Sequence, residues 1–149
     1  MTIKLSREII NHSLHEHVSS TDYSFESEAV VTDSASLVKI CEVLKSAPGI
    51  ELDYLSSVTA VDYPDYFEVV YLFYSIKHNH SLTLKVRCPD KQQPDIPSIT
   101  PLYNGANYQE REIYDLFGIS FVSHPKLRRI FLWEGYPGHP LRKDYGIGS

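Results

Sequence analysis

Cysteine, methionine and long apolar runs are all scarce in this chain of 149 residues. It has two cysteines and one methionine, and no apolar run approaches the roughly 18 residues that span a bilayer. The first residues, Met1-Thr2-Ile3-Lys4, carry no apolar core of the kind that a secretory signal needs. We therefore expect a protein that is cytosolic in itself, with one domain large enough to bury a hydrophobic core.

The two cysteines, Cys41 and Cys88, stand alone without C-x-x-C spacing. Two such ligands cannot build an iron–sulfur cluster, so we expect both thiols to be buried and reduced. The chain also lacks a G-x-G-x-x-G motif after a strand, a P-loop and a nucleophile with an evident base. These absences predict a chain with no catalytic residues, no cofactor and no metal of its own.

Charge is unevenly distributed along the chain. Residues 1–119 hold 9 basic and 17 acidic side chains, whereas residues 120–149 hold 5 basic and 2 acidic ones. A basic C-terminal segment on an acidic body could suggest nucleic acid, but the acidic body repels phosphate and the basic residues form no extended stripe. The pattern favours a protein partner with complementary acidic patches.

Hydrophobic periodicity predicts an α+β fold with a mainly antiparallel sheet and helices packed on it. The strand over residues 66–76 is apolar on both faces, which is typical of a central strand covered on two sides. The next strand alternates strictly, so one of its faces should lie in the core and the other in water. The expected elements are a helix within residues 3–17, a strand over 24–31, a helix between Asp33 and Pro48, and strands over 53–61, 66–76 and 82–88.

Proline is concentrated in the last part of the chain. Seven of the nine prolines lie at or beyond Pro89, and proline removes a backbone donor, so this stretch cannot extend the sheet as a regular central strand. Its many apolar side chains must be buried against the domain or against a partner. We divide one domain into an α+β core, residues 1–97, and a segment 98–149 that holds a helix and an irregular Pro-rich C-terminal arm.

The segment from Asn107 to Gly118 is predicted to form a short helix. Asn107 can accept from the free amides at its start, Glu110 completes a capping-box-like pair, and Gly118 supplies a left-handed residue after its end. Arg111 and Asp115 are four residues apart and can form an intrahelical ion pair. An exposed pair of this kind contributes only about 0.3 to 0.5 kcal/mol, too little to explain so many charges. We therefore favour a network of Glu110, Arg111, Glu112 and Asp115 that fixes the C-terminal arm or a neighbouring subunit.

Arginines and histidines dominate the segment after this helix. Arg128 and Arg129 are adjacent, so in an extended strand one can bind the chain's own carboxylates while the other faces a partner. A metal site built from His124, His139 and Asp144 is not favoured, because His-Pro pairs are common in turns without metal. The cluster His12-x-x-His15-x-His17 is better explained as the polar face of an N-terminal helix.

Three blocks together resemble a known family. They are E-R-E-x-x-D followed by F-G-I over residues 110–119, H-P-x-x-R-R-I over 124–130, and G-H-P-L-R-K-D over 138–144. In order and spacing these signature blocks are similar to those of the C subunit of respiratory NADH:quinone oxidoreductase, or complex I. The resemblance covers about residues 98–145 at the level of motifs.

The resemblance implies a non-catalytic structural subunit of the peripheral arm of a membrane-bound enzyme complex that transfers electrons from NADH to quinone and translocates protons. The C-terminal arm, residues 119–145, would dock the D-like subunit that forms the quinone site, and other partners would be the cluster-binding subunits. Flavin, iron–sulfur clusters and quinone would belong to these partners, and the location would be peripheral, on the cytoplasmic face of the energy-transducing inner membrane or its organelle-interior equivalent. The residues implied to bind partners are Glu110, Arg111, Glu112, Asp115, Gly118, His124, Pro125, Arg128, Arg129, Gly138, His139, Pro140, Leu141, Arg142, Lys143 and Asp144.

Departures from the common family pattern keep two alternatives open. Gln109 stands where an aromatic residue often precedes the E-R-E block, and Pro137 precedes the Gly-His-Pro turn. Related domains occur in energy-conserving membrane-bound hydrogenases and in dehydrogenases fed by ferredoxin or a deazaflavin. An alternative of another class is a free-standing small enzyme that uses the Glu, Arg and His side chains for acid and base catalysis.

Overall fold

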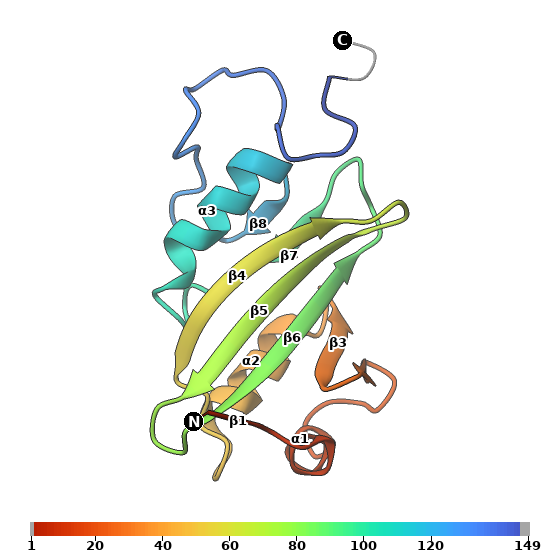
Figure 1. Cartoon of the computed structure of the whole chain (residues 1–149), viewed down its shortest axis with the longest axis vertical. Coiled ribbons are helices and arrows are strands. Elements are labelled where there is room, and N and C mark those ends of the chain that lie inside the picture. The colour runs from red at the N-terminus through yellow and green to blue at the C-terminus, as the bar shows by residue number, and fades with distance from the viewer. Residues whose placement is uncertain (1, 147–149) are drawn as a thin grey trace.

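A mixed sheet of six strands organises the chain in the computed structural model, which describes residues 2–146. The strand order is β2-β3-β6-β5-β4, and β1 pairs with β6 outside this path. Helix α2 lies behind the sheet in the view of Figure 1, whereas α3 lies beside β4. The elements are β1 Ile3–Lys4, α1 Arg7–Leu14, β2 Tyr23–Glu26, β3 Ala29–Asp33, α2 Leu37–Ser46, β4 Tyr54–Asp62, β5 Phe67–Ser75, β6 His80–Cys88, β7 Asp95–Pro97, α3 Ala106–Phe117 and β8 Ser120–Val122.

Strands β4, β5 and β6 follow one another along the chain and pair antiparallel as two hairpins. Strands β1 and β3 both pair parallel with β6, at different parts of its length. Helices cover one face of this sheet, and the predicted α+β class with a mainly antiparallel sheet is confirmed.

The region predicted as one strand over residues 24–31 is instead a hairpin of β2 and β3, with Phe25 opposite Val30. The turn between them places Ser27 at a φ of 56°. Gly, Asn or Asp usually marks such a left-handed position in a sequence. Because Ser27 and Glu28 give no such signal, the prediction of a single strand was wrong.

The hydrophobic core lies between the sheet and the helices. Phe67, Val69, Tyr71 and Phe73 of β5 are completely buried and face this core, and the alternating residues of β6 join them as predicted. The opposite face of β5 was expected to be covered as well. Its residues 70, 72 and 74 are only half-buried, so β5 is an interior strand with helices on one side.

Of the two N-terminal helices, α1 is shorter than predicted and α2 agrees with its predicted range. Helix α1 is shorter than the predicted range 3–17, because Ser6 accepts from the Ile9 N–H at 3.4 Å and starts the helix there. Helix α2 buries Leu37, Ile40, Cys41 and Leu44 at the predicted spacing and ends before Pro48. Asp33 accepts the Ser36 N–H at 3.2 Å, immediately before this helix.

The Pro-rich last third does not extend the main sheet. Strands β7 and β8 form a separate parallel pair, with Ile96 opposite Phe121, and α3 connects them. Residues 147–149 of the predicted arm lie outside the described residues. Both cysteines are free and buried. No helix within residues 2–146 has the length and apolar character that crossing a membrane requires.

Candidate functional site

Helix α3 carries the first signature block and begins one residue earlier than predicted. Gly118 follows its last residue at a φ of 78°, which is the predicted left-handed end. The predicted cap at Asn107 is wrong: Gly105 precedes the helix, and no side chain caps it. The Asn107 carbonyl instead accepts a hydrogen bond from His124 Nε2 at 3.1 Å. The start of α3 is thereby joined to the turn that follows β8.

Glu110 is a completely buried carboxylate on the inner face of α3. It accepts from the Ser98 hydroxyl at 2.6 Å and from the Ile99 N–H at 2.9 Å, so it holds the loop between β7 and α3 and not the start of the helix. His124 Nε2 lies 4.0 Å from its Oε1 atom. Burial raises the pKa of Glu110 to about 7, although the hydrogen bonds from Ser98 and Ile99 oppose this shift.

Asp115 is the second buried carboxylate of α3, and it binds three successive backbone amides of the arm. Its Oδ2 atom accepts from the N–H groups of residues 130, 131 and 132 at 3.1, 2.8 and 3.1 Å. Its Oδ1 atom lies 3.5 Å from Arg129 Nη1 without hydrogen-bond geometry, so this contact is an ion pair. The Arg129 side chain is only 11% exposed. The charge network therefore joins α3 to the arm.

Arg111 also binds the arm, as the favoured charge network predicts, and the alternative intrahelical pair with Asp115 is not formed. Its guanidinium donates to the carbonyls of Arg128 and Arg129 at 3.0 and 3.3 Å. Arg128 and Arg129, considered above as part of an extended strand, lie in an irregular segment, as expected of the arm as a whole. Arg111 and Asp115 of α3 form hydrogen bonds with the backbone carbonyls and amides of residues 128–132. In a sheet, these groups would pair with a neighbouring strand. A helix thus replaces the sheet partner of this segment.

The third signature block covers the C-terminal end of α3. The carbonyls of residues 115–117 accept from His139 Nδ1 at 2.9 Å, the Leu141 N–H at 2.9 Å and Arg142 Nη1 at 3.5 Å. These are among the carbonyls that a helix leaves without internal partners. A Cβ atom on Gly118 would lie 2.7 Å from the His139 ring. Position 118 therefore requires glycine both for its backbone conformation and for this ring contact.

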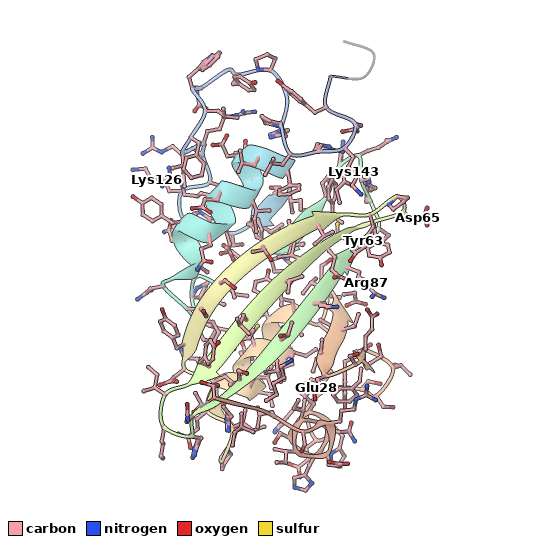
Figure 2. The ribbon with its side chains drawn as sticks, in the orientation of Figure 1. Glu28, Tyr63, Asp65, Arg87, Lys126 and Lys143 are labelled. Atoms are coloured by element: carbon pink, nitrogen blue, oxygen red, sulfur yellow. The ribbon has the colours of Figure 1, made fainter. Side chains whose placement is uncertain are left out.

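The end of the arm is fixed to the end of β4 and to the loop that follows β6. Lys143 donates its backbone N–H to Asp62 at 2.8 Å, and Arg142 donates to the Lys91 carbonyl at 2.7 Å. Burial alone would raise the pKa of Asp62, but the Lys91 ammonium and the Lys143 N–H outweigh it and lower this pKa. In the view of Figure 2, Lys143 and Lys126 lie on opposite sides of α3. The arm therefore loops around the helix (Figure 1).

Some predicted site residues take no part in this network through their side chains. Arg128, Lys143 and Asp144 are exposed, although Asp144 accepts from Arg142 at 3.2 Å. Gly138 contributes through its carbonyl, which accepts from Arg129 Nη2 at 3.0 Å. Pro125 is exposed, Pro140 is half-buried, and Glu112 forms no hydrogen bond or ion pair with residues 2–146.

Four residues that contribute to the site were not predicted. Gln109 accepts the Val58 N–H at 2.6 Å, so the residue that departs from the family pattern satisfies a donor on the outer edge of β4. Ser98, Asp62 and Lys91 bind Glu110 or the arm. The sequence marks Asp62 only as part of a turn, because its partners lie 29 and 81 residues away.

The two histidines of the signature blocks, His124 and His139, form hydrogen bonds within the chain. His124 accepts the Lys126 N–H at its Nδ1 atom at 2.9 Å, so its ring proton lies on Nε2, where it donates to Asn107. His139 donates to a helix carbonyl. Within the described part of the chain, no three His, Cys, Asp or Glu side chains are arranged to hold a metal ion.

Comparison with known proteins identifies relatives by sequence. Residues 30–149 match the family described as respiratory-chain NADH dehydrogenase, 30 Kd subunit. The chain is 47% identical over 114 residues to the mitochondrial NADH-ubiquinone oxidoreductase 30.4 kDa subunit of Neurospora crassa, an alignment that covers 74% of this chain and 40% of that protein. It is 40% identical over 147 residues to the C subunit of the NADH-quinone oxidoreductase of Jannaschia, with coverage of 96% and 70%.

The chain is also similar to a third relative and to a solved structure. The C 2 subunit of the NADH-quinone oxidoreductase of Rhizobium meliloti is 42% identical over 114 residues, which cover 74% of this chain and 62% of that protein. The chain thus spans less than two thirds of the Neurospora and Rhizobium relatives. The fold matches a chain of the membrane-bound sulfane sulfur reductase, an archaeal respiratory membrane complex, with a TM-score of 0.76, 20% identity and coverage of 94% and 85%. This last likeness shows the fold alone.

The network predicts that Asp115→Ala will loosen the arm without unfolding the core. The substitution leaves Arg129 and three backbone amides without their acceptor, and breaking a buried ion pair costs roughly 3 to 5 kcal/mol. We expect limited proteolysis to cleave residues 123–145 much faster than in the wild type, while the α+β core stays resistant. Asp144→Ala is the control, because that carboxylate is 68% exposed and its pair contributes at most about 1 kcal/mol. Equal cleavage of both variants would contradict the account.

The raised pKa of Glu110 predicts that the stability of the chain depends on pH. Its folded-state pKa of about 7 lies above its ordinary value of 4.5, so the folded chain binds an extra proton between these two values. The free energy of unfolding contributed by this group should therefore fall as the pH rises from 4.5 to 7. Glu110→Gln keeps an acceptor for Ser98 or Ile99 and should remove this slope. Denaturant unfolding at pH 5 and 7.5 measures it, and parallel curves for the two proteins would refute the assignment.

Proposed function

The chain belongs to the respiratory-chain NADH dehydrogenase 30 Kd subunit family, and from this we propose that it is a non-catalytic structural subunit of a membrane-bound NADH:quinone oxidoreductase. The relatives named above, at 40 to 47% identity, are all subunits of NADH-quinone or NADH-ubiquinone oxidoreductases. Their names favour this reaction over the hydrogenase and ferredoxin alternatives. The fold by itself does not, because it also occurs in a sulfane sulfur reductase complex.

The observation that carries the proposal is that α3 binds the backbone of the arm while aromatic side chains of the arm are exposed to solvent. Phe131 and Trp133 are 62% and 67% exposed, yet the backbone amides of residues 130–132 are bound by the buried Asp115. Large apolar side chains exposed close together along the chain are typical of protein interaction sites. An arm that is already ordered loses little conformational freedom when it docks, and this favours binding.

We assign the outer surface of the arm to the D-like subunit that forms the quinone site, with cluster-binding subunits as further neighbours. The arm carries five basic and two acidic side chains beyond residue 119, on an otherwise acidic body. Complementary acidic patches on the partner would steer this docking and fix its orientation. The subunit would then lie peripherally, on the cytoplasmic or organelle-interior face of the energy-transducing membrane.

The same geometry supports a structural role over acid and base catalysis. Glu110 and Asp115 are completely buried, and their oxygens bind groups of the same chain. A general acid or base must reach a substrate proton within hydrogen-bond distance. We therefore place flavin, iron–sulfur clusters and quinone in the partner subunits, and electron transfer coupled to proton translocation in the assembly.

The proposal predicts that the double substitution Phe131→Ser and Trp133→Ser impairs assembly without unfolding the chain. Both side chains are exposed, so the melting temperature of the isolated chain should stay within a few degrees of the wild type. The amount of chain found in the large membrane complex, measured on native gels of detergent-solubilised membranes, should fall several-fold. Tyr54→Ser, at an exposed aromatic position on β4, is the control. Wild-type assembly of the double variant would reject the arm as the docking element.

A further inference from the structure

Glu112 differs from the other two carboxylates of the first signature block. Glu110 binds the loop before α3, and Asp115 binds the arm, whereas the Glu112 side chain forms no hydrogen bond or ion pair with the described residues. Its position on α3 is half-buried. Its carboxylate oxygens therefore remain available to a donor or a cation from outside the chain.

The surroundings of Glu112 form an apolar groove between α3 and β4. Residues 58–60 of β4 make one wall, Leu116 and Phe117 of α3 make the other, and Leu141 of the arm lies at its rim. The groove encloses about 270 Å³, and Leu141 is 53% exposed. Glu112 is the one charged side chain among the residues that line it.

The chain's own arginines beside α3 are already engaged. Arg111 donates to two carbonyls of the arm. Arg142 binds the Lys91 carbonyl, the Phe117 carbonyl and Asp144. Either side chain would have to leave these acceptors before it could pair with Glu112. The groove therefore combines apolar walls with one uncompensated negative charge.

We propose that this groove is an interaction surface that receives an arginine or lysine side chain from a partner subunit. A basic side chain has an apolar stem, which would lie along Leu116, Phe117 and Leu141, and a cationic head, which would pair with Glu112. This side-chain chemistry matches both the apolar walls and the negative charge of the groove. The inference rests on the proposed function and adds a second contact, on the side of α3 that faces β4.

The test compares Glu112→Gln and Glu112→Lys with Glu42→Lys, the latter at an exposed carboxylate on α2. Each tagged full-length chain replaces the native one, and the fraction in the large membrane complex is measured. We expect Glu112→Lys to reduce this fraction by about tenfold, Glu112→Gln to reduce it less, and Glu42→Lys to leave it unchanged. The melting temperatures of both isolated Glu112 variants should equal or exceed that of the wild type, because no intrachain partner is lost.

Two results would overturn the groove proposal alone: wild-type assembly of Glu112→Lys, or melting temperatures of the Glu112 variants that fall in parallel with their assembly. The second would show that Glu112 stabilises the chain itself. A wild-type chain that is absent from every membrane complex would instead overturn the proposed function. These outcomes separate the two hypotheses, because the first two require that the wild-type chain assembles.

Discussion

The arrangement of the C-terminal arm depends on one buried carboxylate, Asp115. Its Oδ2 atom accepts three successive backbone N–H groups of a segment that has no strand partner. Hydrogen bonds to an ionised acceptor contribute about 1.5 to 3 kcal/mol each, roughly twice as much as neutral ones. This one interaction sets the position of residues 130–132, and separate contacts fix the parts of the arm before and after them.

Other signature residues also join α3 to the segments that follow it. His124 binds its first turn, Arg111 binds the carbonyls of the arm, and the block around His139 covers its last carbonyls. The arm therefore encircles the helix before any partner is present. Because α3 binds the backbone of the arm, the exposed aromatic side chains of the arm present a defined surface, as the proposed role in a large complex would require.

Local features of this fold could be predicted from sequence, whereas long-range pairing could not. The spacing of Leu37, Ile40, Cys41 and Leu44 predicted α2, and Gly118 predicted the end of α3, because these signals act within a few residues. A charge network around Asp115 that fixes the arm was expected, but its role as the acceptor of three backbone amides was not predicted. An arginine four residues before it offered a local ion pair, but its true partners lie 15 to 17 residues further along the chain. Asp62 likewise resembled an ordinary turn residue.

Hydrogen–deuterium exchange of the free chain tests most directly whether α3 orders the arm in advance. The amides of residues 130, 131 and 132 should exchange at least about tenfold more slowly than in an unstructured peptide, since each donates to a buried carboxylate. Exchange of these three amides at the rate of an unstructured peptide would contradict the account. It would show that a partner subunit, and not Asp115, orders the arm.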